Sequence, residues 1–268
     1  MKETDGQLFL EDIPVKSLIT EYGTPTFIYS SRTIEENFNK YKNEIRDDDL
    51  ICYAVKANSN LHILKLLISL GSGFDVVSGN ELKRCLIAGA DKKKIVFSGV
   101  AKSIEEIKFA IENDILSINV ESVGEFKRII QISEDLNKAV NCALRINPDI
   151  STGSHEYIET GKKTSKFGLD SQAIRTISEL AMKSELTKIT TIASHIGSQI
   201  SDESLILNSL DSMIDVAEEL SRRGHHIENL DIGGGLGIKY KDENEGDPKT
   251  LIDRVKNRLQ KTDYNLIL

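Results

Sequence analysis

The chain is poor in cysteine, in basic charge and in long apolar runs, and each shortage argues against a class of protein. Its three cysteines, Cys52, Cys85 and Cys142, are widely spaced and odd in number. They therefore form neither a disulfide framework nor a CxxC zinc pattern, and we expect them to be reduced and buried. The five histidines also lack the spacing of metal ligands, so we predict no metal site.

Charge and hydropathy narrow the possible partners. The 268 residues carry a formal charge of −8 without a basic stripe, which argues against nucleic acid as the main partner. No stretch approaches the roughly 18–20 consecutive apolar residues of a membrane span. Residues 1–10 lack the apolar core of a signal peptide. We expect a cytoplasmic protein without a membrane partner.

Apolar runs alternate with amphipathic helical segments along most of the chain. Strand-like runs recur at 50–55, 73–77, 94–98, 116–120, 140–146, 189–194, 228–232 and 264–268. Helices are predicted before the first run at 15–22 and 33–44, and between the runs at 60–70, 79–88, 103–113, 122–135, 171–184 and 202–223. This alternation predicts an α/β fold with a (β/α)8 TIM-type barrel, and an open doubly wound sheet is the alternative.

Three segments break this alternation. Residues 24–30, TPTFIYS, form a short β-rich run introduced by Pro25. Residues 147–170 lack periodicity over a length that is more typical of a lid or binding loop than of a plain connection. Residues 239–249 are polar and charged, and we predict that they form a solvated loop.

Polar residues stand at or near the ends of successive predicted strands. Lys56 follows the first strand, Asp75 lies in the second, Arg145 ends the fifth and His195 follows the sixth. In a (β/α)8 barrel the C-terminal ends of the strands meet at one face, where active sites form. Each residue alone is more often an ordinary solvated side chain, but together they predict a polar site at that face.

The glycine run DIGGGLG at 231–237 follows the seventh predicted strand. Its glycines leave backbone N–H groups uncovered, which suits a phosphate oxyanion. The run is neither the GxGxxG dinucleotide fingerprint nor a P-loop, and a purely structural turn is the alternative. Nearby in the predicted barrel, His195 and Ser198 would present a flat ring to a flat ligand and a hydroxyl to its phosphate.

A strand-end lysine, a phosphate-binding turn and a stacking ring together indicate pyridoxal 5′-phosphate. The amine of Lys56 would form a Schiff base with the cofactor aldehyde, and the protonated pyridine ring would accept electrons from the substrate. A barrel in which Lys56 is structural and no cofactor binds is the alternative.

Five motifs of the chain resemble those of a known enzyme family. They are YAVKAN at 53–58, GFDVVSGNEL at 73–82, HEYIETGKKTSKFGL at 155–169, HIGSQ at 195–199 and DIGGGLG at 231–237. In this order they resemble the diaminopimelate decarboxylases, a branch of the fold-type III pyridoxal-phosphate enzymes, over essentially the whole chain. The resemblance implies decarboxylation of meso-2,6-diaminopimelate to L-lysine and carbon dioxide, in lysine biosynthesis, by a homodimer.

The resemblance also assigns roles to individual residues. It implies that Lys56 carries the Schiff base, that His195 stacks on the cofactor ring and that Asp75 lies close to Lys56. The residues that it implies for cofactor binding are Lys56, His195, Ser198, Gly233, Gly234, Gly235 and Arg145, of which Arg145 organises the polar floor.

The chain departs from this family at its end. Family members are longer, with a Glu-Pro-Gly-Arg motif after the eighth strand and a C-terminal β-domain that supplies a cysteine acid across the dimer. We therefore expect residues 31–268 to form the barrel of a truncated chain, and residues 1–30 to lend a strand to an absent β-domain. Such a chain would lack the acidic partner of the pyridine nitrogen, the substrate-carboxylate arginine and the cysteine acid. It would be weakly active or inactive.

Two other functions stay open. One is a decarboxylase of another basic amino acid, such as ornithine, arginine or carboxynorspermidine. The other is a non-catalytic barrel protein that binds pyridoxal phosphate. The stretch at 155–169 favours the diaminopimelate branch over both.

Overall fold

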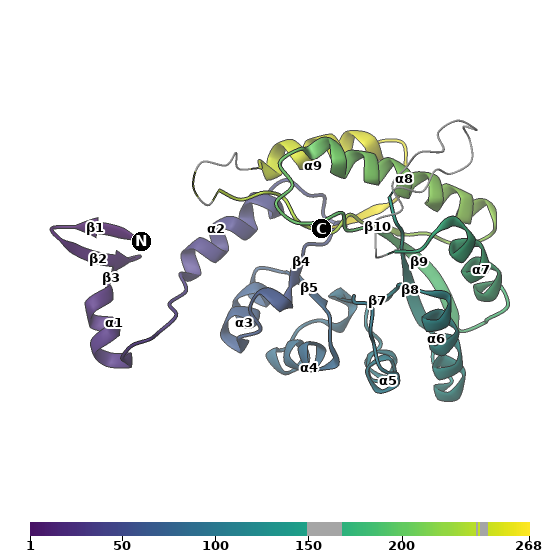
Figure 1. Cartoon of the computed structure of the whole chain (residues 1–268), viewed down its shortest axis with the longest axis horizontal. Helices are drawn as coiled ribbons and strands as arrows, with labels where there is room; N and C mark the ends of the chain where they lie inside the picture. Colours follow the sequence, from purple (N-terminus) through teal and green to yellow (C-terminus); the bar gives the residue numbers. More distant parts are fainter. Residues whose placement is uncertain (149–167, 240, 242–245) are drawn as a thin grey trace.

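The computed structural model describes residues 1–148, 168–239, 241 and 246–268. An eight-stranded parallel sheet lies at its centre, with the strands side by side in sequence order (Figure 1). These strands are β4 (Cys52–Ala54), β5 (Gly73–Val76), β6 (Ile95–Phe97), β7 (Ser117–Val120), β8 (Val140–Arg145), β9 (Thr187–Ala193), β10 (Asn229–Asp231) and β11 (Asn265–Ile267). All eight predicted strands are confirmed.

The sheet closes into a barrel between its first and last strands. Leu50 and Ile267 form a parallel bridge. The N–H of Leu50 donates to the carbonyl of Leu266 at 2.8 Å, and the N–H of Cys52 donates to the carbonyl of Leu268 at 2.8 Å. These bonds satisfy the edge groups that an open sheet would expose, so the (β/α)8 barrel is confirmed and the open sheet is excluded.

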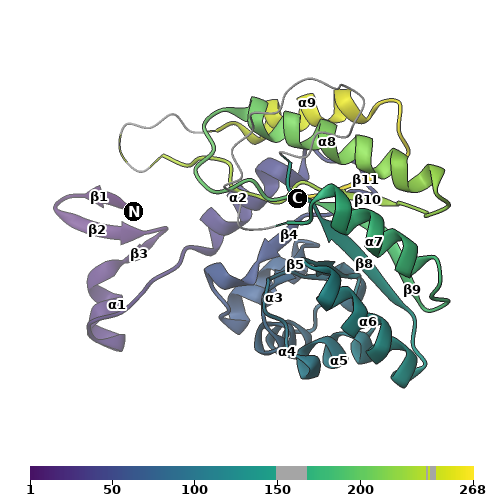
Figure 2. The ribbon, with the colours of Figure 1, turned by 45° about the vertical axis from the view of Figure 1, so that its right-hand side comes forward.

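Helices surround the barrel on its outside (Figure 2). They are α2 (Ser31–Lys42), α3 (Leu61–Ser69), α4 (Gly79–Ala88), α5 (Ile104–Asn113), α6 (Val123–Leu136), α7 (Ser171–Ala181), α8 (Glu203–Arg222) and α9 (Pro248–Leu259). Serine side chains cap several helix starts: Ser78, Ser103 and Ser122 each accept the N–H of the residue three positions on. The helices predicted from periodicity all form, whereas α9 was missed.

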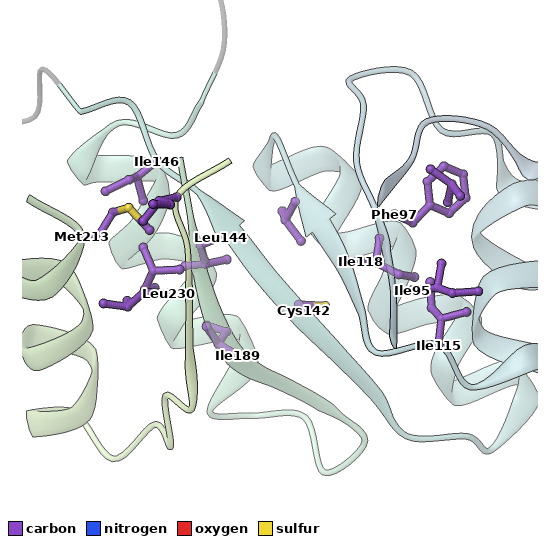
Figure 3. Close-up of a cluster of buried hydrophobic side chains, with 14 of the residues drawn as sticks. Ile95, Phe97, Ile115, Ile118, Cys142, Leu144, Ile146, Ile189, Met213 and Leu230 are labelled. Carbon is purple, nitrogen blue, oxygen red and sulfur yellow. The ribbon is translucent and has the colours of Figure 1, made fainter. Parts of the chain in front are cut away.

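Apolar side chains fill the space between the strands and the helices. Phe97, Ile118, Leu144 and Leu230 on the strands and Met213 on α8 are all fully buried (Figure 3). Because successive side chains of a strand point to opposite faces, the residues between these outward-facing ones point into the barrel. This alternation places polar side chains inside the barrel.

A small antiparallel sheet at the N-terminus stands apart from the barrel (Figure 1). It consists of β1 (Lys2–Thr4), β2 (Gln7–Leu10) and β3 (Ile13–Pro14), followed by the predicted helix α1 (Val15–Tyr22). Residues 24–30 pair with no strand in the described chain and most of them are exposed, as expected for a segment whose partner strand would lie in a further domain, and its role as a lent strand stays a prediction. A strand needs a partner for its backbone N–H and C=O groups, and none of those described lies beside this segment.

The remaining expectations concern the cysteines, the predicted loops and membrane-spanning helices. All three cysteines are free; Cys85 and Cys142 are buried, whereas Cys52 is only half-buried. The motif at 155–169 lies largely outside the described residues, as do the predicted loop at 147–170 and part of the one at 239–249. Over the ranges given above, no helix combines the length and the apolar character needed to cross a bilayer.

Candidate active site

The C-terminal ends of the barrel strands open into one cavity of about 440 Å³. Small-molecule sites typically enclose roughly 300–1,000 Å³. Every predicted site residue lines this cavity: Lys56, Asp75, Arg145, His195, Ser198, Gly233, Gly234 and Gly235. The structure therefore brings together side chains and glycines from five separate strand ends.

Lys56 enters the cavity from a short turn that follows the first barrel strand, as the position of the predicted strand implied. β4 ends at Ala54, and a single 3₁₀ turn, η1 (Val55–Ala57), follows. Val55 is fully buried and anchors the turn, whereas Lys56 is exposed toward the cavity. Within the described chain Lys56 makes no side-chain hydrogen bond or ion pair, so its amine is open to a ligand.

Asp75 lies on the floor of the cavity. It points into the barrel between Phe74 and Val76, which are both fully buried on the outer face. Burial raises the pKa of the Asp75 carboxyl, while a hydrogen bond from Ser98 and the positive charge of Lys56 partly oppose that rise. Its Oδ1 atom is buried and has no hydrogen-bond partner in the described structure.

Asn119 of β7 extends this polar floor. Its Nδ2 donates to Oγ of Ser98 at 3.0 Å. Its Oδ1 is buried and, like Oδ1 of Asp75, finds no partner among the residues described. Buried polar atoms are normally hydrogen-bonded. Two buried oxygens without hydrogen-bond partners in one cavity therefore indicate a site for a polar ligand.

Asp231 adds a second buried carboxyl to the floor. It ends β10 and is only 8% exposed, and its Oδ1 accepts the N–H of Gly233 at 3.0 Å. Burial, followed by the nearby charge of Asp75, raises the pKa of Asp231 to about 7. At neutral pH the floor therefore carries less than two full negative charges.

His195 follows β9 and lies beside the glycine turn. The ring can be reached from the cavity. Its partial burial in the wall lowers the pKa of His195, and the positive charges of Arg145 and Lys56 lower this pKa further. The imidazole is therefore neutral at pH 7. A neutral, flat ring at the cavity wall suits stacking on an aromatic ligand.

The glycine turn after β10 packs tightly against the loop after β9. Gly235 has a φ of +108°, and a Cβ on it would collide with the carbonyl of Gly197. The N–H of Ile200 donates to the carbonyl of Gly235 at 2.8 Å, which joins the two loops. The N–H groups of Gly234 and Gly235 find no acceptor in the described structure, so they form an open nest that suits a phosphate group.

A comparison with family models decides the class of this site. Residues 31–265 match the pyridoxal binding domain of the pyridoxal-dependent decarboxylases. The chain belongs to the pyridoxal-dependent decarboxylase family. The open amine of Lys56, the uncovered glycine N–H groups and the orphaned floor oxygens fit a pyridoxal group, so the sequence-based prediction of a pyridoxal-dependent domain is confirmed.

Several relatives resemble the chain over nearly all of its length. The chain is 43% identical over 265 residues to the diaminopimelate decarboxylase of Aquifex aeolicus, which covers 98% of the chain and 63% of that relative. The structure of the diaminopimelate decarboxylase of M. jannaschii is 35% identical with a TM-score of 0.90, and the match covers 100% of this chain and 65% of that one.

A third relative was solved with a ligand. The diaminopimelate decarboxylase of Helicobacter pylori, complexed with L-lysine, is 38% identical with a TM-score of 0.86. That match covers 94% of this chain and 64% of the relative. The chain thus spans slightly less than two thirds of the length of the relatives that it matches.

The sequence analysis did not predict a buried ion pair that lies behind the cavity wall. Lys102 and Glu125 form an ion pair at 2.9 Å, with side chains only 1% and 3% exposed. Glu125 follows the N-cap Ser122 by three positions, so in sequence it resembles an ordinary capping-box residue on an exposed helix end. Nothing in the local sequence marks Lys102 as buried.

Proposed function

We propose that this barrel binds pyridoxal 5′-phosphate and that the whole protein decarboxylates meso-2,6-diaminopimelate to L-lysine and carbon dioxide. The convergence of Lys56, His195 and the glycine turn in one cavity supports cofactor binding. The relatives support the substrate: they carry the name diaminopimelate decarboxylase, and one of them was solved with L-lysine. L-lysine is the product expected of this reaction.

The chain's own residues divide the work of holding the cofactor. The bound cofactor supplies an aldehyde that bonds to amines and a pyridine ring that accepts the electrons released with carbon dioxide. Lys56 would hold the aldehyde carbon. Ser198 and the N–H groups of the glycine turn would hold the phosphate, and the neutral ring of His195 would lie against the flat ring.

Asp75 would control protons near Lys56. The charge of Lys56 lowers the pKa of Asp75 against the effect of burial, so the two groups interact electrostatically. A carboxyl whose pKa is raised by burial holds a proton more readily than an exposed aspartate, which suits general acid–base work. Asp75 would therefore donate a proton to the amine of Lys56 or accept one from it.

The division of the chain is part of the same proposal. Residues 1–30 form an N-terminal segment distinct from the barrel of 31–268. The start of the family match at residue 31 and the separate position of the N-terminal sheet support this division. A homodimer in the cytoplasm stays a prediction.

An absorbance titration tests the cofactor site. Adding pyridoxal phosphate to the wild type should produce a visible band that is absent from Lys56→Ala and from Lys56→Arg, which keeps the positive charge. The absence of a band in the wild type would contradict cofactor binding. A band of equal strength in both variants would place the bond on another amine.

A second step tests the substrate. meso-Diaminopimelate, ornithine and arginine are added in turn to the loaded protein, and the band and carbon dioxide release are followed. The proposal predicts that diaminopimelate perturbs the band at the lowest concentration. An equal or stronger response to ornithine or arginine would overturn the substrate assignment and leave the cofactor site intact.

A further inference from the structure

A buried ion pair ties two segments of the cavity wall together. The Nζ of Lys102 donates to the carbonyls of Gly99 and Asn119, both at 2.6 Å, and to Oε1 of Glu125 at 2.9 Å. All three donors of the ammonium group are thus used. Gly99 and Asn119 both line the cavity, so Lys102 links the loop after β6 to the end of β7.

The other oxygen of Glu125 carries this tie to the next residue of the wall. Its Oε2 accepts the backbone N–H of Glu121 at 2.7 Å. The side chain of Glu121 then reaches β8, where its Oε1 lies 2.6 Å from Nη1 of Arg145. The Glu121 side chain is only 5% exposed and that of Arg145 17%. Two ion pairs, Lys102–Glu125 and Glu121–Arg145, are therefore joined through the backbone N–H of Glu121 and run from behind the wall into the cavity.

Stability alone does not explain this arrangement. Removing charges from water is costly, and a buried ion pair replaced by apolar side chains of similar size is often neutral or more stable. What the charged arrangement provides is a fixed direction for the guanidinium of Arg145. The planar guanidinium and the carboxylate hold each other by directional hydrogen bonds.

The position of Arg145 matters for the rest of the site. Burial lowers the pKa of His195, the positive charges of Arg145 and Lys56 lower it further, and a hydrogen bond with the Gly234 backbone opposes this. Arg145 also lowers the pKa of Asp75 and of Asp231 against the effect of burial. The charge of Arg145 therefore acts on the pKa of three groups in the cavity.

We propose that Glu121, anchored by the buried Lys102–Glu125 pair, is a positioning residue that holds the guanidinium of Arg145 toward the cavity. Through Arg145 it sets the charge felt by His195 and the floor carboxyls. The proposal concerns this chain's own residues and holds with or without the cofactor. It goes beyond the proposed reaction, in which Glu121, Glu125 and Lys102 have no assigned role.

Two substitutions of Glu121 distinguish positioning from a simple charge effect, because the two explanations predict opposite shifts in the pKa of His195. Glu121→Gln keeps an oxygen that accepts from Arg145 but removes a negative charge, so the pKa of His195 should fall or stay unchanged. Glu121→Leu removes the acceptor, so Arg145 should turn away and the pKa of His195 should rise toward its value in Arg145→Met. The loss of negative charge by itself would push that pKa in the opposite direction.

The measurement is an NMR titration of the histidine ring protons in the cofactor-free chain. Five histidines give few signals, and His195→Gln identifies the one that belongs to His195. A rise in Glu121→Leu with no rise in Glu121→Gln supports the proposal. A fall, or no change, in a folded Glu121→Leu variant overturns it.

Two further variants guard against trivial explanations. Asp49→Asn weakens a comparable buried carboxylate–arginine pair outside this cavity, and it should leave the pKa of His195 unchanged. If Glu121→Leu does not fold, the double variant Lys102→Met/Glu125→Met removes the anchor without changing net charge, so a shift at His195 reports geometry. No shift in that folded double variant also contradicts the proposal.

The outcome is independent of the proposed function. The titrations need no pyridoxal phosphate, so they succeed or fail whether or not Lys56 binds it. The absorbance titration above decides that separate question.

Discussion

The seam between the first and last strands depends on one buried carboxylate, that of Asp49. Its oxygens accept from Nη2 of Arg46 at 2.7 Å and from the backbone N–H of Leu266 at 2.8 Å. Arg46 also donates to the carbonyl of Tyr264 at 2.8 Å. Asp49 and Leu266 are 217 residues apart in sequence. This contact therefore joins the two ends of the barrel sheet, and Asp49→Asn should weaken the closed fold.

The expected loss follows from the charge on Asp49. Hydrogen bonds to charged groups contribute about 1.5–3 kcal/mol each, and breaking a buried pair costs about 3–5 kcal/mol. Asparagine still accepts from Leu266, and Arg46 is partly exposed, so we expect a loss of about 3 kcal/mol, in the lower part of that range. At ~2–4 °C per kcal/mol for a domain of this size, Tm should fall by roughly 6–12 °C.

Thermal and urea unfolding of Asp49→Asn measure this loss, with Asp48→Asn as the matched control. Asp48 is the exposed neighbour, so the same change there should cost almost nothing. Burial tends to raise the pKa of Asp49, but the hydrogen bonds from Arg46 and Leu266 outweigh it and lower the pKa overall. The stability advantage of wild type is therefore present above about pH 4, the ordinary pKa of aspartate, and is lost as pH falls through the lower folded-state pKa. Equal stability of Asp49→Asn and Asp48→Asn at pH 7 would refute this account of the seam.

Two further predictions concern the cavity. Gly235→Ala should lower both the stability of the fold and its affinity for pyridoxal phosphate, because the new Cβ would collide with the carbonyl of Gly197. The control is Gly124→Ala, which places a Cβ in open space on α6. Equal affinities of the two variants in a binding titration would contradict the need for this close approach. Asp231→Asn keeps the acceptor for Gly233 but cannot ionise. Since the pKa of Asp231 is raised to about 7, wild type loses stability as pH rises from about 4 through 7, and the Tm of the variant relative to wild type should increase from pH 5 to pH 8. A Tm difference that does not change with pH would count against the buried ionisation.

The barrel could be predicted because its strands are buried on both faces. Such strands appear in the sequence as short apolar runs, and the intervening helices show a 3.6-residue period. The N-terminal strands were missed for the opposite reason: residues 2–4 and 7–10 are short and mostly exposed, so burial leaves little pattern in them. The run at 24–30 has strand-like composition but no described strand beside it.

The helix α9 was missed although its start carries a recognisable signal. Asp247 accepts the N–H groups of Lys249 and Thr250, and Pro248 occupies the first helical position. Its apolar residues are spaced for one helix face, but they follow a polar loop, and the charged residues between them hid the period.

The site was predictable where the backbone alone places a residue. The strand-end rule located Lys56, Asp75, Arg145 and His195, because parallel strands all end at one face of a barrel. It could not locate Glu121 as the partner of Arg145, because that contact depends on which side chains turn inward after a strand ends. Contacts between side chains on separate strands leave no trace in a single sequence.

The central claim is that Lys56 is the amine that holds the pyridoxal aldehyde. The most direct test is to reduce the chain with borohydride in the presence of pyridoxal phosphate and to map the labelled peptide by mass spectrometry. The account predicts one dominant label on Lys56, absent from Lys56→Arg. A label spread over surface lysines, or a dominant label elsewhere that persists in Lys56→Arg, would contradict it.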